Sequence, residues 1–375
     1  MMIPERIYLD FNASTPIAPE VAEAMMPFLS QHFGNPSSQH WAGIPAKEAV
    51  ENARRQVAEL LQCSPEEIVF TSGGSESNNH AIKGTFFALR EKGNHIITTQ
   101  IEHPAVVNPC RFLEKLDAEV TFIPVDRYGR VDPDDIRKAI TPRTILITVM
   151  HANNEVGTIQ PIEEISKIAK ERNIVFHTDA AQAVGKISTK VDDLGVDLLS
   201  VAGHKLYAPK GIGALYIRKG TPIEPLIHGA SHESNRRAGT ENVLLIVGLG
   251  KACEIAKRYL SDDKIRNLRD RFWKLLQENF GESIALNGHP VHRLPNTLNV
   301  SFVKKAGGEI LSRLDGVAAS TGAACHSGSV ELSPVLKAMG ISNEVGMGAV
   351  RFSLGRTTTI EEVDRVVQSL EKILT

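Results

Sequence analysis

The run Thr144-Ile145-Leu146-Ile147-Thr148-Val149 decides the fold class, because five of its six residues are β-branched and none is charged. Such a run is typical of a strand that is buried on both faces of a sheet. Helical spacing follows over residues 162–169, and a second apolar, β-branched run lies at residues 174–177. Strand, helix and strand in this order indicate parallel strands joined by a crossover helix.

Runs of the same kind lie upstream, at residues 68–71, 96–99 and 120–123. Helical spacing also occurs, at residues 46–61 and 75–89. From residue 68 to residue 178 the order therefore reads β-α-β-α-β, which predicts an α/β fold with a mostly parallel sheet flanked by helices. Between residues 196 and 217 the strands follow one another without a long helix, which indicates a sheet edge or a local reversal.

The composition shifts after Thr240, where two long helical patterns are followed by short strands near residues 298–301. This order predicts a second, smaller α+β domain. We expect the large domain to cover residues 15–254. We expect the small domain to combine residues 1–14 with residues 255–375.

Composition excludes several classes of protein. The 375 residues carry 42 basic and 44 acidic side chains, and no Lys/Arg run exceeds a doublet, so a nucleic-acid partner is not expected. No signal-peptide pattern and no stretch of about 18 apolar residues is present, so we expect a cytoplasmic protein without a membrane partner. The four cysteines form no CxxC pattern, which favours reduced thiols over disulfides or a metal site.

Two nucleotide-binding patterns fail. Gly248-Leu249-Gly250 lies inside a helical pattern with no strand before it, so it is not a dinucleotide fingerprint. Residues 180–187 superficially match a phosphate-binding P-loop around Gly185-Lys186, but the first glycine and the terminal Ser/Thr are missing. Neither a Rossmann dehydrogenase nor a kinase or ATPase is favoured.

The sequence TSGGSESNN at residues 71–79 follows a predicted strand and opens a helical segment. Glycines there let the backbone approach an anion, which exposed N–H groups and the positive end of the helix dipole would bind. The same pattern also fits a plain strand-to-helix turn with Ser75 as the N-cap.

Two charged residues end apolar strands. Asp179 lies at the carboxyl end of a predicted strand, where open α/β sheets bind ligands. It is either a helix cap or the partner of a cation such as a protonated pyridine nitrogen. Lys205 follows the apolar run at residues 198–202, where burial would lower the pKa of its amine and favour Schiff-base chemistry. A lone lysine, by contrast, is usually a surface residue.

These segments stand in order with several others. The motifs are LDFNASTP at 9–16, FGNPSS at 33–38, TSGGSESNN at 71–79, EH at 102–103, HANNEVG at 151–157, HTDAAQ at 177–182, GHK at 203–205 and RAGT at 237–240. Over residues 8–374 the chain resembles the cysteine desulfurase and selenocysteine lyase group of class-V, fold-type-I pyridoxal-phosphate enzymes. The resemblance implies the fold-type-I transferase architecture, with the cofactor in the large domain.

The resemblance implies pyridoxal 5′-phosphate as the cofactor and assigns residues to it. Lys205 is implied as the lysine that carries the cofactor and then removes the substrate Cα proton, with Asp179 on the pyridine nitrogen. Gln182 and Asn154 are implied as hydrogen-bond partners of the phenolic oxygen that also hold the substrate. His103 is implied as the imidazole that stacks on the ring and shuttles protons.

Phosphate binding is implied for Gly74, Ser75 and His204, with Thr240 supplied by the second subunit of a homodimer. The chain departs from the family at Ala202, where a hydroxyl residue is common. This departure predicts the loss of one phosphate hydrogen bond, unless Ser200 or water supplies it.

Two residues of the small domain complete the implied site. Arg351 alternates out of phase with its apolar neighbours, and the resemblance makes it the clamp of the substrate α-carboxylate. Cys325, in GAACHSGS at 322–329, is implied as the nucleophile on a mobile loop, with His326 helping to form its thiolate. The other cysteines are predicted to be packing residues: Cys63, Cys110 and Cys253.

The implied activity converts L-cysteine to L-alanine and leaves the sulfur as a persulfide on Cys325. It would supply iron–sulfur clusters, thio-modified tRNA or a related pathway through an unidentified sulfur-acceptor protein. The alternatives are a selenocysteine lyase, which carries a similar cysteine segment, and another class-V aminotransferase reaction. A scaffold without chemistry is disfavoured because every implied cofactor position except Ala202 is chemically competent.

Overall fold

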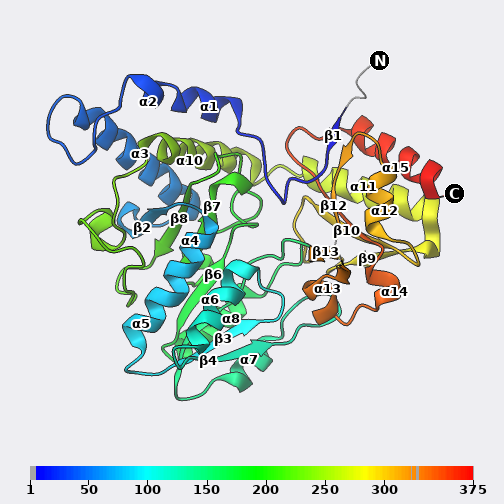
Figure 1. Cartoon of the computed structure of the whole chain (residues 1–375), viewed down its shortest axis with the longest axis horizontal. Helices are drawn as coiled ribbons and strands as arrows, with labels where there is room; N and C mark the ends of the chain where they lie inside the picture. Colours follow the sequence, from blue (N-terminus) through cyan, green and yellow to red (C-terminus); the bar gives the residue numbers. More distant parts are fainter. Residues whose placement is uncertain (1–5, 322, 327–328, 375) are drawn as a thin grey trace.

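The computed structural model describes residues 6–321, 323–326 and 329–374, which form two adjoining parts, each built on its own sheet (Figure 1). The large part contains a seven-stranded sheet in the order β2-β8-β7-β6-β5-β3-β4. Its strands are β2 (Ile68–Thr71), β3 (His95–Thr99), β4 (Glu119–Ile123), β5 (Thr144–Thr148), β6 (Val175–Asp179), β7 (Leu198–Ala202) and β8 (Gly213–Ile217).

The large sheet is parallel except at β8, which pairs antiparallel with both β2 and β7. The predicted reversal is therefore confirmed, but it lies inside the sheet and not at an edge. The other six strands run in one direction, so their carboxyl ends share one edge. The five predicted strands are confirmed to within two residues.

The simple β-α-β-α-β order was wrong in omitting two crossover helices, α6 (Pro104–Glu114) and α7 (Pro133–Ala139). Pro109 lies inside α6 and interrupts its helical pattern, since proline lacks the backbone N–H that a helix interior needs. Helix α7 has only 7 residues, which is too short for a clear periodicity.

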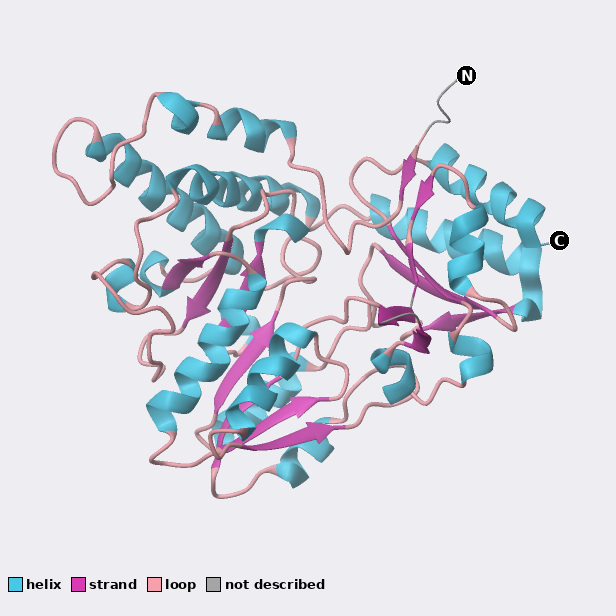
Figure 2. Cartoon of the chain, in the orientation of Figure 1, coloured by secondary structure: helices cyan, strands magenta, loops and turns pink. Residues whose placement is uncertain are grey.

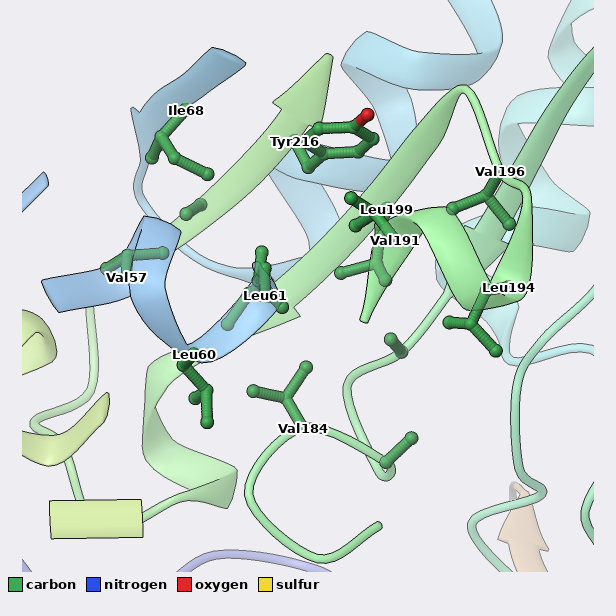
Figure 3. Close-up of a cluster of buried hydrophobic side chains, with 14 of the residues drawn as sticks. Val57, Leu60, Leu61, Ile68, Val184, Val191, Leu194, Val196, Leu199 and Tyr216 are labelled. Atoms are coloured by element: carbon green, nitrogen blue, oxygen red, sulfur yellow. The ribbon is translucent and has the colours of Figure 1, made fainter. Parts of the chain in front are cut away.

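Helices cover both faces of the large sheet (Figure 2). One face packs against α3 (Gly43–Leu61), α8 (Ile162–Glu171) and α10 (Val243–Ala256). The other face packs against α4 (Gly74–Asn79), its continuation through a π-turn into α5 (Thr85–Leu89), and α6. Alternate strand residues point to opposite faces, as the pleat requires: Ile68 and Phe70 join the first core, whereas Val69 joins the second. Figure 3 shows Leu61, Ile68, Leu199 and Tyr216 within the first core.

The small part contains an antiparallel sheet in the order β12-β15-β10-β9. Its strands are β9 (Ile284–Asn287), β10 (Thr297–Phe302), β12 (Ser320–Thr321) and β15 (Ala349–Ser353). It packs against α11 (Lys264–Phe280), α12 (Gly307–Arg313) and α15 (Ile360–Leu374), around a separate core that includes Phe272 and Phe352. The domain boundaries at residues 14/15 and 254/255 stay a prediction.

The N-terminal segment belongs to both parts. Strand β1 (Ile7–Tyr8) pairs with β11 (Val317–Ala318), and Leu9 is buried in the small core. The segment then crosses to the large part, where the backbone N–H of Thr15 donates to the carbonyl oxygen of His204 over 2.9 Å. It thereby carries Asn12 past the carboxyl edge of the large sheet.

The remaining elements are short. The helices are α1 (Pro19–Met25), α2 (Pro27–Ser30), α9 (Val191–Leu194), α13 (Pro334–Ala338) and α14 (Asn343–Gly346). Strands β13 (Ala323–His326) and β14 (Ser329–Leu332) form an antiparallel ribbon, so the described backbone of the cysteine segment is paired, and its mobility stays a prediction. Within the described residues, no helix has the length and apolar character that crossing a membrane demands.

A buried ion pair fixes a strained loop of the large part. Glu233, Ser234 and Asn235 all have positive φ angles, of 48°, 55° and 66°, which is costly for residues other than glycine. The Glu233 carboxylate accepts hydrogen bonds from Arg54 Nη1 and Nη2 at 2.8 Å each and from the Phe70 backbone N–H at 2.9 Å. This anchor holds the loop that leads to Thr240.

We expect Arg54→Met to destabilise the fold by about 3–5 kcal/mol, because it leaves the Glu233 carboxylate buried without its ionic partner. Urea unfolding followed by circular dichroism measures this loss. The double variant Arg54→Met/Glu233→Leu is the control and should lose clearly less than the sum of the two single variants. A single-variant loss below about 1 kcal/mol would contradict the role of the pair.

Candidate active site

A cavity of about 600 Å³ opens at the carboxyl edge of the large sheet, between the two parts. Nine of the predicted site residues line it: Gly74, Ser75, His103, Asn154, Asp179, Gln182, His204, Lys205 and Arg351. They come from the end of β6, from the segments that follow β2, β3, β5, β6 and β7, and from β15 of the small part. The common edge of the parallel strands is what brings together residues that lie far apart in the sequence.

Lys205 lies in a short 3-10 turn directly after β7. Its Nζ donates hydrogen bonds to the carbonyl oxygens of Asn12, at 2.6 Å, and Ala13, at 2.8 Å. Burial lowers the pKa of the Lys205 amine to about 8, and the Arg351 guanidinium acts in the same direction. At pH 7 about a tenth of the amine is therefore neutral, far more than for a lysine of ordinary pKa, and the neutral amine is the form that attacks a carbonyl.

Asp179 ends β6 as a buried carboxylate. Its Oδ2 accepts from Asn78 Nδ2 at 2.7 Å, and its Oδ1 accepts from the Ala181 backbone N–H at 2.9 Å. No helix follows directly, because residues 181–186 form turns, so the alternative of a helix cap was wrong. An anionic side chain fixed in the cavity wall suits a cationic ring nitrogen.

The glycine turn forms the end of the cavity near β2. Helix α4 begins at Gly74 with Gly73 as its N-cap, so Ser75 is not the N-cap. Gly73 has φ 146°, a conformation that side chains disfavour, and a Cβ on Gly74 would lie 3.1 Å from the Ala202 Cβ. The turn therefore presents backbone N–H groups at close range, as phosphate binding requires.

The missing hydroxyl at Ala202 is not replaced by Ser200. The Ser200 side chain is buried in the sheet, where its Oγ lies 3.0 Å from His177 Nε2. Lys210, which sequence reasoning did not select, lines the cavity together with Ala202 and His204. Its cationic side chain suits the same anion that the glycine turn would hold.

His103 is the N-cap of α6, and its Nδ1 accepts from the Ala105 backbone N–H at 3.1 Å. A neutral imidazole that accepts at Nδ1 carries its proton on Nε2. Partial desolvation lowers the pKa of His103 below its ordinary value. Its Nε2 is therefore the atom that can exchange a proton with a group in the cavity.

Arg351 enters the cavity from β15. Its Nη2 donates to Asp10 Oδ1 at 2.7 Å, and its Nη1 donates to the carbonyl oxygen of Asn154 at 2.9 Å. Its Nε is buried and has no hydrogen-bond partner among the described residues. A fixed guanidinium with a spare donor is suited to a carboxylate ligand.

Two predicted residues are not brought to the cavity by the described structure. Thr240 is exposed and does not line it. The side chain of Cys325 lies outside the described residues, although its backbone pairs with Val330 across the β13–β14 ribbon.

The other three cysteines are packing residues, as predicted. Cys110 and Cys253 are fully buried and Cys63 is half-buried, and none of them lines the cavity. Burial raises the pKa of each of these thiols to about 12, which makes them poor nucleophiles.

Comparisons with known proteins agree with this geometry. The sequence model of the aminotransferase class-V family matches residues 7–366. Cysteine desulfurase IscS of Dictyoglomus turgidum is 54% identical over 98% of this chain and 94% of its own length. The corresponding protein of Methanosarcina thermophila is 51% identical over 98% of this chain and 92% of its own length.

The chain belongs to the class-V aminotransferases, among the cysteine desulfurases. A solved NifS-like protein of this fold is 40% identical, covers 98% of this chain and 99% of its own, and superposes with a TM-score of 0.92. SspA, solved in complex with cysteine, is 41% identical over 93% of this chain and 98% of its own, with a TM-score of 0.84. Enzymes of this family depend on pyridoxal phosphate.

The cavity of this desulfurase fits that cofactor. Lys205 supplies an amine of low pKa, Asp179 supplies the anion for the pyridine nitrogen, and the turn at Gly73 supplies N–H groups for the phosphate. No group of three or more His, Cys, Asp or Glu side chains in the described part of the chain forms a metal site.

Besides Lys210, sequence reasoning missed three residues that support the site. Asn78 holds Asp179, Asn12 accepts from Lys205, and Lys186 donates to Gln182. The first two lie in motifs that were quoted for the resemblance, but no pattern showed their contacts. Lys186 was considered only as part of a failed P-loop; its spacing of four from Gln182 was the available signal.

We expect the rate of cofactor attachment to Lys205 to rise with pH and to level off above about pH 8, where the amine becomes mostly neutral. The growth of visible absorbance after cofactor is added to stripped enzyme measures this rate. Lys205→Ala should show no such growth at any pH. A wild-type rate that keeps rising about tenfold per pH unit up to pH 10 would contradict a desolvated amine.

Proposed function

We propose that this chain converts L-cysteine to L-alanine and transfers the sulfur to Cys325 as a persulfide. The observation that carries the proposal is the placement of the Lys205 amine, the Asp179 carboxylate and the Arg351 guanidinium around one cavity. The 54% identity to a cysteine desulfurase and the likeness to a protein solved with cysteine support this substrate.

The reaction balances without an external oxidant or reductant. The Cβ–S bond of the substrate breaks, and Cβ gains a proton to give the methyl group of alanine. A new S–S bond forms between the substrate sulfur and the Cys325 sulfur. Carbon is reduced and sulfur is oxidised within the same step.

Pyridoxal phosphate, when bound, withdraws electrons from the substrate Cα and so makes its proton acidic. Arg351 binds the substrate carboxylate and thereby orients the Cα–H bond. Lys205 Nζ, as a neutral amine, takes the Cα proton. His103 Nε2 is placed to pass a proton to or from the reacting groups.

We propose a homodimer in which Thr240 of the partner subunit completes the phosphate site. The exposed position of Thr240 supports this arrangement, because the residue follows an anchored loop and does not line its own cavity. Large apolar side chains near the N-terminal helices support a covered surface: Met26, Leu29, Phe33 and Trp41 are 60–79% exposed.

The sulfur acceptor is proposed to be a separate protein, in a cytoplasmic pathway such as iron–sulfur cluster assembly. A persulfide must pass its outer sulfur to another thiol or cluster, which requires the carrier segment to meet a partner. The names of the relatives, IscS and NifS-like, support this assignment.

A selenocysteine lyase is the second candidate, favoured by the GAACHSGS segment at 322–329. Selenium in the substrate leaves more readily than sulfur, so that reaction depends less on the Cys325 thiol. Another class-V aminotransferase reaction would instead give a keto acid and no reduced sulfur.

The decisive experiment compares Cys325→Ala with the wild type on L-cysteine and L-selenocysteine, with alanine, sulfide and selenide as the measured products. We expect the variant to lose at least about a hundredfold in activity on cysteine, since it lacks the nucleophile. Cys63→Ala is the matched control and should keep full activity. Undiminished turnover of cysteine by Cys325→Ala would overturn the persulfide route, and a wild-type enzyme that turns over selenocysteine but hardly any cysteine would favour the lyase.

A further inference from the structure

Lys186 is a lysine whose amine lies behind the wall of the active-site cavity. It ends the series of turns that follows β6, four residues after Gln182. Its Nζ donates to Gln182 Oε1 at 2.9 Å and to Asn12 Oδ1 at 3.2 Å. Among the described residues no carboxylate lies within 4.0 Å of it, so its partners are the oxygens of two neutral amides.

The Lys186 amine has enough hydrogens for both contacts whether it is charged or neutral, so the two oxygens that it contacts are the acceptors. The terminal amide of a glutamine otherwise turns with little preference between its two ends. With Oε1 held by Lys186, the Nε2 end of Gln182 faces the carbonyl oxygen of Asn12, to which it donates at 3.0 Å. Lys186 therefore settles which end of this amide is the donor.

The cavity receives the donor end of Gln182. Gln182 and Asn12 line the cavity, whereas Lys186 does not, so Oε1 points away from the ligand space. The amide nitrogen carries two hydrogens, and Asn12 takes one of them. The second hydrogen is left for an acceptor atom inside the cavity.

Burying the Lys186 amine at this position costs desolvation free energy. Burial lowers the pKa of Lys186 to about 7, and the nearby cations Lys205 and Arg351 act in the same direction. Methionine has a similar length and would fill the space without this desolvation cost. The contacts to Gln182 and Asn12 are what the amine supplies and methionine lacks.

We propose that Lys186 is a positioning residue that fixes the Gln182 amide with its NH₂ group toward the cofactor, so that this group donates to the phenolic oxygen. The proposal rests on pyridoxal-phosphate binding in this cavity. Lys186 acts through Gln182 and does not touch the cofactor or the substrate itself. A donor on that oxygen favours its anionic form, which strengthens cofactor binding and lowers the pH at which the bound chromophore loses its proton.

The test is a double-mutant cycle of Lys186→Met and Gln182→Leu, with two readouts besides activity. The first is the dissociation constant of pyridoxal phosphate from stripped enzyme, and the second is the pH midpoint of the visible absorption band. Lys186→Met should raise the dissociation constant of the cofactor about three- to tenfold, which corresponds to the net free energy of one hydrogen bond. It should also raise the pH midpoint of the absorption band. Because both variants remove the same donor, the double variant should be no worse than Gln182→Leu.

Lys167→Met, an exposed lysine on α8, is the matched control and should leave both readouts unchanged. Lys186→Arg keeps a side chain that only donates and should restore the midpoint, even where Lys186→Met lowers the melting temperature. Additive effects in the cycle, or a midpoint in Lys186→Met equal to that of the control, would overturn the proposal. A wild-type enzyme that binds no cofactor would instead refute the proposed function.

Discussion

The hydrogen bonds from the Lys205 amine to two backbone carbonyls are the contact on which the rest of the site depends. The carbonyls belong to Asn12 and Ala13, in a segment that crosses from the small part to the large part. They hold the amine at the carboxyl edge of the sheet, where burial keeps its pKa low. Without that segment the lysine would extend into water and regain its ordinary basicity.

Asn12 extends this contact to the whole site. Its side chain donates to Thr297 Oγ1 at 2.8 Å and to the carbonyl oxygen of Asn154 at 3.2 Å, and its Oδ1 accepts from Asn296 and from Lys186. Residues of both parts therefore meet at one buried amide. Buried polar networks are stable only when all their members are hydrogen-bonded. A shift between the two parts would therefore disturb the hydrogen bonds that Lys205 and Gln182 make to Asn12.

The strands, the glycine turn, Asp179 and Lys205 were predictable from local patterns, whereas the other cofactor residues were implied only by the family resemblance. A β-branched run such as residues 144–149 indicates a strand by itself, and the residues that follow such strands must share one edge. The position of β8 inside the sheet was not predictable, since antiparallel pairing with β2 joins strands about 145 residues apart. The Lys186 contact was missed for a related reason: only the fold shows that its amine is buried and not exposed.

Two features depend on more than this chain's local sequence. The role proposed for Thr240 requires a second subunit, and Thr240 is exposed in the single chain. The cysteine segment was predicted to be a loop because it is rich in small residues, yet its described backbone forms a ribbon held by pairing with β14. Small residues permit both arrangements, and the ladder of backbone hydrogen bonds decides between them.

The most direct test of the account is to identify which lysine carries the cofactor. Two amines of lowered pKa lie near the cavity, Lys205 and Lys186, and the account gives them different roles. Borohydride reduction of the holoenzyme, followed by peptide mapping by mass spectrometry, distinguishes them. The account predicts that the reduced cofactor is attached to Lys205 alone; attachment to Lys186, or to neither lysine, would contradict it.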